Sequence, residues 1–283
     1  MLLNNCSQIF TLGPEGTFSD EATQKIRGEV IIVTYTGTFA EALLRVTENP
    51  ASAAVVPIEN SVAGTVAQVQ DSLVSNKLVI LGEINLLIEY SLLANAAPEE
   101  VKLCYAHPQA LEQSSKFLSK NLAASQNQLT RSNVDSGIQF LQAIKSDNGA
   151  LAAIVPASFA DSYPEWKVAT GIQDYHNNTT RFLVVRPRQE NEEHDFSRKK
   201  TSLYVEFQED RSGLLYELLS VFNLFQINLC RLESGPAKDT PWAYVFYVDF
   251  YNTEHTEACL DVMRVTKFNY KVLGSYDLID RLA

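Results

Sequence analysis

The chain lacks the sequence features of several protein classes. Its 283 residues include only four cysteines, and these are scattered without C-x-x-C or other ligand-like spacing, which argues against structural zinc and a disulfide framework. The first residues contain no basic segment followed by a long apolar one, so we expect no secretory signal. Even the apolar stretch Leu78–Leu93 is interrupted by Glu83 and Glu89, and it cannot span a membrane. We therefore expect a protein of a reducing compartment, the cytoplasm.

Basic charge is also scarce, and this excludes another class. The net charge is −11, with 16 Lys and Arg against 22 Asp and Glu up to Lys200, and 7 against 12 beyond it. Neither part has the basic footprint of a nucleic-acid-binding protein. An anionic ligand would have to be held by helix N-termini, backbone amides and a few arginines.

The first two-thirds of the chain alternates short apolar segments with amphipathic ones. We expect strands at Ile9–Leu12, Val30–Tyr35, Ala53–Val56, Leu78–Glu83, Tyr90–Ala94, Leu103–Ala106, Ala150–Val155 and Phe182–Val185. We expect helices at Asp20–Arg27, Phe39–Glu48, Ser61–Leu73, Gln109–Lys120, Asp135–Lys145 and Pro156–Asp161. This alternation predicts an α/β fold with largely parallel sheets. The number of elements is sufficient for two lobes with a small-molecule site between them.

A polar, charged stretch at Arg186–Lys200 breaks this pattern and reads as a linker. The segments after it predict strand, helix, two strands, helix and strand, which is the ferredoxin-like βαββαβ order. They lie at Thr201–Phe207, Ser212–Phe222, Asn228–Leu232, Ala243–Phe250, Glu254–Arg264 and Tyr270–Tyr276. We therefore predict a two-lobed domain over 1–187, a linker over 188–200 and a smaller domain over 201–283.

Two loops combine polar side chains with the start of a helix. Gly13–Ser19 joins a strand to a helix, and Ser19 is a plausible N-cap. Asn60 and Ser61 follow the buried strand Ala53–Val56, where they can cap a helix or face a ligand at its positive end. Capping is the commoner role in both loops, and the two roles can coexist.

Two further segments carry groups that suit an anionic ligand. His107 ends a strand and is more simply explained as structural, whereas Gln109 could point into a cleft. Arg181, between Thr180 and Phe182, could pair with a surface carboxylate or bind a substrate carboxylate through two hydrogen bonds. Because basic residues are few, the second role is favoured.

Taken together, these motifs resemble the prephenate dehydratase family over nearly the whole chain. The matching stretches are Gly13–Ser19, Pro57–Ser61, His107–Leu111 and Thr180–Phe182. The C-terminal segment resembles the ACT domain of that family through Gly213–Leu215, Asn228–Leu229 and Glu233–Pro236. The resemblance implies two α/β lobes, similar to periplasmic binding proteins, with the active site in the cleft between them.

The resemblance also implies a reaction. Prephenate would lose its ring hydroxyl and its ring carboxylate, as CO2, to give phenylpyruvate in phenylalanine biosynthesis, without a metal or other cofactor. Thr180 would assist the departing hydroxyl by donating a hydrogen bond, and Arg181 would anchor a carboxylate. The other substrate-binding residues would be Thr17, Ser19, Asn60, Ser61, Gln109, Ser136, Asn178 and Phe182.

The ACT resemblance implies phenylalanine as a feedback effector and a homodimer or homotetramer. The regulatory ligand would contact Gly213, Leu214, Leu215, Asn228, Leu229, Glu233 and Ser234. The sequence departs from the family at Gly235, where arginine is usual, which reduces the support for regulation. A module that only dimerises the enzyme is the alternative.

Further departures lie in the catalytic part. Asp135–Gln139 replaces a Ser-Thr-Ala-x-Ala stretch, Tyr90 stands where histidine is common, and Ser114 where cysteine is common. The changes at Tyr90, Gly137 and Gln139 keep one alternative open, a prephenate decarboxylase with a non-aromatic product. An arogenate dehydratase also stays open, and the fold alone would permit a binding protein without catalysis. Related decarboxylases tend to lack the threonine, so Thr180 favours the dehydratase.

Overall fold

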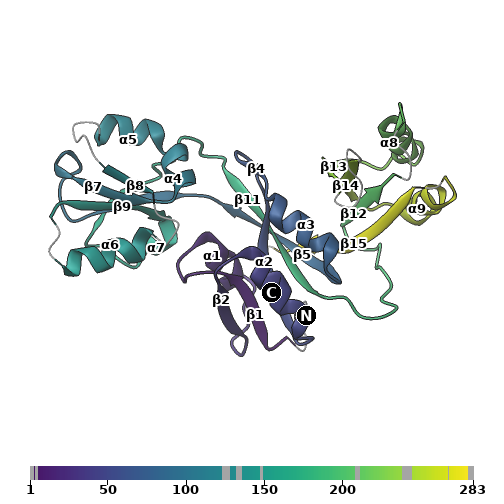
Figure 1. Cartoon of the computed structure of the whole chain (residues 1–283), viewed down its shortest axis with the longest axis horizontal. Coiled ribbons are helices and arrows are strands. Elements are labelled where there is room, and N and C mark those ends of the chain that lie inside the picture. Colours follow the sequence, from purple (N-terminus) through teal and green to yellow (C-terminus); the bar gives the residue numbers. More distant parts are fainter. Residues whose placement is uncertain are drawn as a thin grey trace.

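The computed structural model describes residues 3, 6–122, 128–131, 136–146, 149–207, 211–237, 244–266 and 268–279, with the backbone alone at 128–131 and 136. Its strands form two sheets, one of ten strands and one of five. The smaller sheet lies at one end of the molecule, the C-terminal module lies at the other, and the N-terminal lobe lies between them (Figure 1). None of the helices in this described part is long and apolar enough to cross a membrane.

The first lobe is the N-terminal half of the ten-stranded sheet, in the order β5-β11-β3-β1-β2. Its strands are β1 (Gln8–Leu12), β2 (Ile32–Thr36), β3 (Ser52–Asn60), β5 (Leu78–Leu87) and β11 (Thr179–Pro187), with the short β4 (Gly64–Thr65) paired to β3. Its helices are α1 (Phe18–Gln24), α2 (Phe39–Glu48) and α3 (Ala67–Ser75). The central strand β3 is apolar and buried on both faces, as expected for a strand covered by helices on both sides.

The second lobe is the five-stranded sheet, in the order β10-β6-β9-β7-β8. Its strands are β6 (Tyr90–Ala94), β7 (Leu103–Ala106), β8 (Gln128–Arg131), β9 (Leu151–Pro156) and β10 (Lys167–Thr170). Its helices are α4 (Pro108–Gln113), α5 (Ser115–Asn121), α6 (Ser136–Lys145) and α7 (Ala157–Asp161), and a 3-10 turn covers Pro98–Glu100. The chain passes between the lobes twice, from β5 to β6 and from β10 to β11.

The C-terminal module consists of β12 (Lys200–Glu206), α8 (Leu214–Leu224), β13 (Leu229–Pro236), β14 (Tyr244–Tyr251), α9 (Thr256–Val265) and β15 (Asn269–Leu278). The strand order β13-β14-β12-β15 is that of a ferredoxin-like sheet. At Asp277 and Leu278, β15 pairs in parallel with β5, so the module extends the sheet of the first lobe. The predicted α/β class, with two lobes and a ferredoxin-like C-terminal part, is confirmed. The expectation of largely parallel sheets is wrong, because both lobes have mixed sheets in which β11 is antiparallel to β3 and β5, and β6 is antiparallel to β9 and β10.

Several sequence expectations need correction. The helix expected over Ser61–Leu73 begins only at Ala67, because Asn60–Thr65 forms a tight hairpin with β3. The helix expected over Gln109–Lys120 is divided at Ser114 into α4 and α5. Strands β8 and β10, each of four residues, were not expected. Asp135, the first residue of one expected helix, lies outside the described residues.

Candidate active site

The chain brings its polar loops together at one edge of the first sheet. Strands β1 and β3 are parallel, so the loops that follow both strands lie at the same edge. Strand β11 runs antiparallel to β3 and begins at this edge, where Thr180 is paired with Asn60. Ser61 strengthens this pairing, because its amide donates to the Thr179 carbonyl and its hydroxyl accepts from the Thr179 amide, both at 2.9 Å. The edge thus juxtaposes residues that are about 120 positions apart in sequence.

Asn60 has its side chain oriented by the backbone of the hairpin. Its Oδ1 accepts hydrogen bonds from the amides of Val62 and Ala63, at 3.0 and 2.8 Å. The Asn60 Nδ2 group therefore points the other way and donates to Thr180 Oγ1 at 2.8 Å and to Asn178 Oδ1 at 2.7 Å. The direction of each hydrogen bond is fixed by the chemistry of an amide, in which only nitrogen donates.

Gln113 completes this network from the second lobe. Asn178 accepts at its Oδ1, so its Nδ2 donates, and the acceptor is Gln113 Oε1 at 2.9 Å. Asn60, Asn178, Thr180 and Gln113 are all buried, and we call them the amide–threonine cluster. Gln113 was missed from sequence, although it lies one helical turn after Gln109 on α4, so both can face the same side.

Among the described residues, the Thr180 hydroxyl uses its oxygen as an acceptor and does not use its proton as a donor. Its oxygen accepts from Asn60, and no described residue lies within hydrogen-bond distance as an acceptor for its proton. A hydroxyl that accepts a hydrogen bond becomes a stronger donor, because successive hydrogen bonds polarise one another. Thr180 is therefore prepared to donate a proton or a hydrogen bond to a bound molecule.

The Gly13–Ser19 loop uses its polar groups internally. The N-cap of α1 is Thr17, whose Oγ1 accepts from the Asp20 amide and donates to the Pro14 carbonyl at 3.0 Å. The expectation of Ser19 as N-cap is wrong, since Ser19 lies within the helix and is buried. Asp20 accepts from the Gly16 amide at 2.9 Å and from the Tyr35 hydroxyl at 2.8 Å. The polar groups of the loop thus bond mainly to the loop itself and its neighbours, and the substrate roles of Thr17 and Ser19 stay predictions.

The remaining expected residues lie in different settings. His107 caps α4, with its Nδ1 accepting from the Gln109 amide at 3.2 Å, as the structural interpretation predicted. The Gln109 side chain is half-buried on α4. Ser136 begins α6, but its side chain lies outside the described residues. Phe182 is a core residue of the first lobe rather than an exposed ligand contact.

Arg181 does not join the amide–threonine cluster. Neighbouring side chains on a strand point to opposite faces, so Arg181 points away from the face that carries Thr180. Its guanidinium forms ion pairs with Asp249, with Glu83 at 3.1 Å and with Glu59 at 3.5 Å. The expected anchoring of a substrate carboxylate is not the arrangement that the structure shows, because three protein carboxylates already surround this guanidinium.

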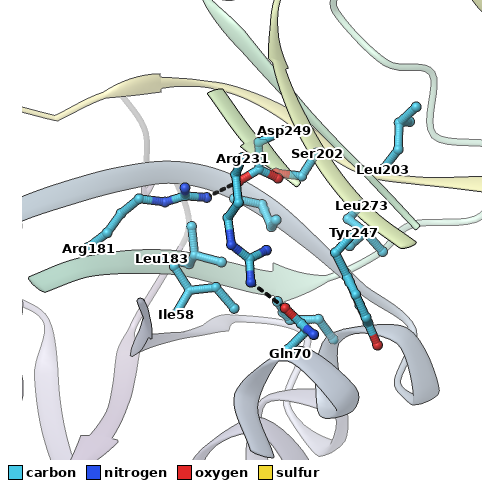
Figure 2. Close-up of a pocket in the computed structure, with 12 residues that line it drawn as sticks. Ile58, Gln70, Arg181, Leu183, Ser202, Leu203, Arg231, Tyr247, Asp249 and Leu273 are labelled. Carbon is cyan, nitrogen blue, oxygen red and sulfur yellow. Dashed lines mark hydrogen bonds and ion pairs between the residues drawn. The ribbon is translucent and has the colours of Figure 1, made fainter. Parts of the chain in front are cut away.

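A small cavity beside Arg181 lies between the first lobe and the C-terminal module. Arg181, Arg231 and Asp249 line its polar side, and Ile58, Leu183 and Leu273 lie among its apolar residues (Figure 2). It has room for about one water molecule, which is too small for a cyclic dicarboxylate. The cavity is therefore a feature of the domain interface and not a substrate site.

Packing against Phe159 explains why glycine occupies position 137 of the second lobe, where the family usually has alanine. A Cβ on Gly137 would lie 2.4 Å from Cε1 of Phe159, and a Cβ on Gly16 would lie 2.4 Å from Cδ2 on the other edge of the same ring. Phe159 is thus held between a glycine of each lobe. Nearby, the Ser158 hydroxyl donates to Glu21 at 2.7 Å, so the two lobes are in direct contact here.

The expected regulatory residues lie on two elements of the C-terminal module. Gly213 has a φ of 90° and precedes α8, whose first residues are Leu214 and Leu215. Asn228, Leu229, Glu233 and Ser234 lie at the start of β13 or on it, and β13 is the edge strand at the C-terminal end of the ten-stranded sheet. A Cβ on Gly235 would make ordinary contacts of 3.6 and 3.9 Å, so nothing in the packing explains this glycine.

Fold and site together define a class: two-lobed α/β proteins with a polar, uncharged cluster where the lobes meet, suited to small polar molecules. Comparison with known proteins makes the class specific, because the family model described as "PDT: Prephenate dehydratase" matches residues 9–190. A prephenate dehydratase from Methanocaldococcus jannaschii is 34% identical over 287 residues, covering 98% of this chain and all of the relative. The chain belongs to the prephenate dehydratase family.

Solved structures of the same family extend the likeness through the C-terminal module. The prephenate dehydratase from Staphylococcus aureus has a TM-score of 0.80 at 27% identity and covers 95% of this chain and 99% of its own. The prephenate dehydratase from Arthrobacter aurescens, in complex with L-Phe, has a TM-score of 0.81 at 27% identity and covers 97% and 91%.

Proposed function

We propose that this chain converts prephenate to phenylpyruvate as a carbon–oxygen lyase, with Thr180 as the hydrogen-bond donor. The bond from the ring to its carboxylate breaks and CO2 leaves. That electron pair enters the ring, which becomes aromatic as the hydroxyl departs from the opposite carbon. The observation that carries the proposal is the buried Thr180 hydroxyl, whose oxygen accepts from Asn60 and for whose proton the described part of the chain offers no acceptor.

The amide–threonine cluster suits this reaction because it stabilises the departing oxygen without adding charge. A donor already in place where negative charge develops lowers the barrier without reorganisation. Asn60, Asn178 and Gln113 carry no charge, so they do not stabilise the scissile carboxylate as an ion pair would. A carboxylate left in a poorly solvated site loses CO2 more readily.

The identity of the product tests the proposed function. We expect purified protein incubated with prephenate at neutral pH to give the aromatic signals of phenylpyruvate by NMR. A heat-inactivated sample controls for the spontaneous reaction. A non-aromatic dihydro product would instead indicate a decarboxylase, and unchanged prephenate would contradict the proposal and call for arogenate as the next substrate.

For the remaining organisation we propose a catalytic domain over 1–187, a linker over 188–200 and an ACT regulatory domain over 201–283. Strand β13 is an outer strand, and an outer strand can pair with a second copy of the chain. This supports a homodimer or homotetramer with the effector site at the paired modules. We also propose a cytoplasmic location, from the free cysteines at 6, 104, 230 and 259.

L-phenylalanine is the proposed effector, supported by the relative that was solved with L-Phe. We expect micromolar to millimolar L-phenylalanine to lower the rate of prephenate turnover, while D-phenylalanine at the same concentration leaves it unchanged. The measurement is the initial rate as a function of effector concentration. Full activity at millimolar L-phenylalanine would leave the module a role in dimerisation only.

A further inference from the structure

The interface between the first lobe and the C-terminal module contains six charged side chains in contact. The first lobe contributes Arg181, Glu83 and Glu59, and the module contributes Lys200, Asp249 and Arg231. We call these six residues the interface charge cluster. Three ion pairs cross the interface: Arg181 with Asp249, Lys200 with Glu83 at 2.6 Å, and Arg231 with Glu59 at 3.6 Å. The positive and negative charges balance, as burial of so many ionised groups requires.

Asp249 lies at the centre of this cluster. It is buried and forms an ion pair with Arg181, while Arg231, which lines the same cavity, donates to Gln70 (Figure 2). Burial by itself would raise the pKa of the Asp249 carboxyl, but the two arginines and a hydrogen bond from Ser202 lower it below its usual value. Asp249 is therefore ionised at neutral pH and holds Arg181 by charge as well as by a hydrogen bond.

The interface charge cluster lies on the opposite face of the sheet from the hydrogen bond between Asn60 and Thr180. In the ladder between β11 and β3, Thr180 pairs with Asn60, and the next pair is Arg181 with Glu59. The side chains of Thr180 and Asn60 belong to the amide–threonine cluster on one face of the sheet. The side chains of Arg181 and Glu59 point to the other face, toward the module. Both members of the second pair are held from the module side, Arg181 by Asp249 and Glu59 by Arg231.

The backbone ladder around Thr180 is continuous on one side of β11 and irregular on the other. Strand β11 pairs with β5 without a register shift from Thr179 to Val184. The register between β11 and β3 shifts between Arg181 and Phe182, which is opposite Pro57. Proline donates no hydrogen bond, and such a bulge changes the direction of the side chains beside it. On the module side, Arg231 also donates to Thr65 Oγ1 at 3.2 Å, on the hairpin strand β4 that is paired with β3. On the β3 side, where the ladder is irregular, side-chain contacts with the module therefore add to the backbone pairing that positions Thr180 relative to Asn60.

We propose that Asp249 is a positioning residue for Thr180 and that it acts through Arg181 across the domain interface. The proposal rests on the proposed function for its kinetic consequence. It assigns to the module a part in turnover even without an effector. It also identifies a physical route by which a bound effector would influence Thr180. Arg231 lies two residues before Glu233, an expected effector residue on β13, and pairs with Asp249 in the ladder between β13 and β14.

The test is Asp249→Asn, which keeps the shape of the side chain and removes its charge. We expect kcat to fall by about 10-fold with KM within about twofold, because misplacement of a catalytic group lowers turnover more than binding. We also expect faster amide hydrogen exchange over residues 178–184. Asp249→Glu, which keeps the carboxylate, should recover part of the lost kcat. The matched control is Asp261→Asn, the same change at an exposed carboxylate of the module that binds Arg264 at 2.8 Å. This control should change neither kcat nor the amide hydrogen exchange over residues 178–184.

The readouts separate the possible failures. A folded Asp249→Asn variant with wild-type kcat and wild-type exchange over 178–184 would overturn the proposal. If that variant does not fold, as judged by circular dichroism, Arg181→Lys decides in its place: an unchanged kcat there would overturn the proposal, and a 10-fold loss would support it. If the wild-type protein does not convert prephenate, the proposed function fails, and the exchange comparison still decides whether Asp249 positions β11.

Discussion

Replacing Thr180 with alanine should lower kcat by about 10²-fold or more, the size of effect seen when one charge-stabilising donor is removed from an active site. KM should change little, because the hydrogen bond to the departing hydroxyl strengthens only as that bond breaks. The fold should tolerate the change, since alanine removes a hydroxyl whose only described hydrogen bond is from Asn60. Steady-state kinetics with prephenate, combined with the thermal midpoint, measure both parts of this expectation.

The preceding residue supplies the matched control for this variant. Thr179→Ala is the same chemical change one position earlier, and the Thr179 hydroxyl donates to the Asn177 carbonyl at 3.4 Å instead of joining the amide–threonine cluster. We expect it to keep nearly normal kcat. Thr180→Ser retains the hydroxyl and should recover most of the activity. Near-normal turnover in Thr180→Ala would remove Thr180 from the mechanism.

Replacing Asn60 with aspartate should be almost as damaging, about 10- to 100-fold in kcat, although Thr180 itself is intact. One oxygen of the new carboxylate could still accept from the Val62 and Ala63 amides, as the Asn60 oxygen does. The other would replace the donor that faces Thr180 and Asn178 with an acceptor. Thr180 would then donate its proton to this carboxylate, and the departing hydroxyl would lose its donor.

The pH dependence of the Asn60→Asp variant distinguishes this explanation from general damage. Burial raises the pKa of a carboxyl group, and the protonated form can donate a hydrogen bond again. The activity of this variant should therefore rise as the pH falls toward that pKa, whereas the uncharged wild-type cluster contributes no such change. Asn177→Asp, at an exposed position just before the strand that carries Thr180, is the control and should behave like the wild type. A variant with a wild-type rate at neutral pH would show that the direction of the Asn60 hydrogen bond does not matter.

The catalytic assignment and the departures from the family pattern fit together in the structure. Gly137 leaves room for Phe159, which also contacts Gly16 of the first lobe. Tyr90, where histidine is common, is buried and packs edge-to-face against Phe18 at 5.3 Å between ring centroids. Both changes therefore involve packing where the lobes meet. Neither removes a member of the amide–threonine cluster, which supports the dehydratase over the decarboxylase.

The sequence by itself was sufficient for the elements that depend on local pattern. Helix α2 spans Phe39–Glu48 as expected, because its apolar residues repeat with helical spacing and Thr38 caps it at the Glu41 amide. The two-lobed α/β class and the βαββαβ order also follow from local alternation. The opposite orientations of Thr180 and Arg181 were not expected, because the strand predicted in this region, Phe182–Val185, begins after both residues. The structure begins β11 at Thr179, and alternate side chains of a strand share a face, so the two side chains do not reach one ligand.

Only the tertiary structure decided which distant residues meet. The hairpin at Asn60–Thr65 competes with helix formation because pairing with β3 satisfies its backbone, and no local pattern reports that pairing. Gln113 reaches Asn178 across 65 residues, and Asp249 reaches Arg181 across 68. Such contacts depend on how sheets extend and pack, here through β15 alongside β5. Charge and polarity therefore identified residues of functional type, and the assembled sheets determined which of them act together.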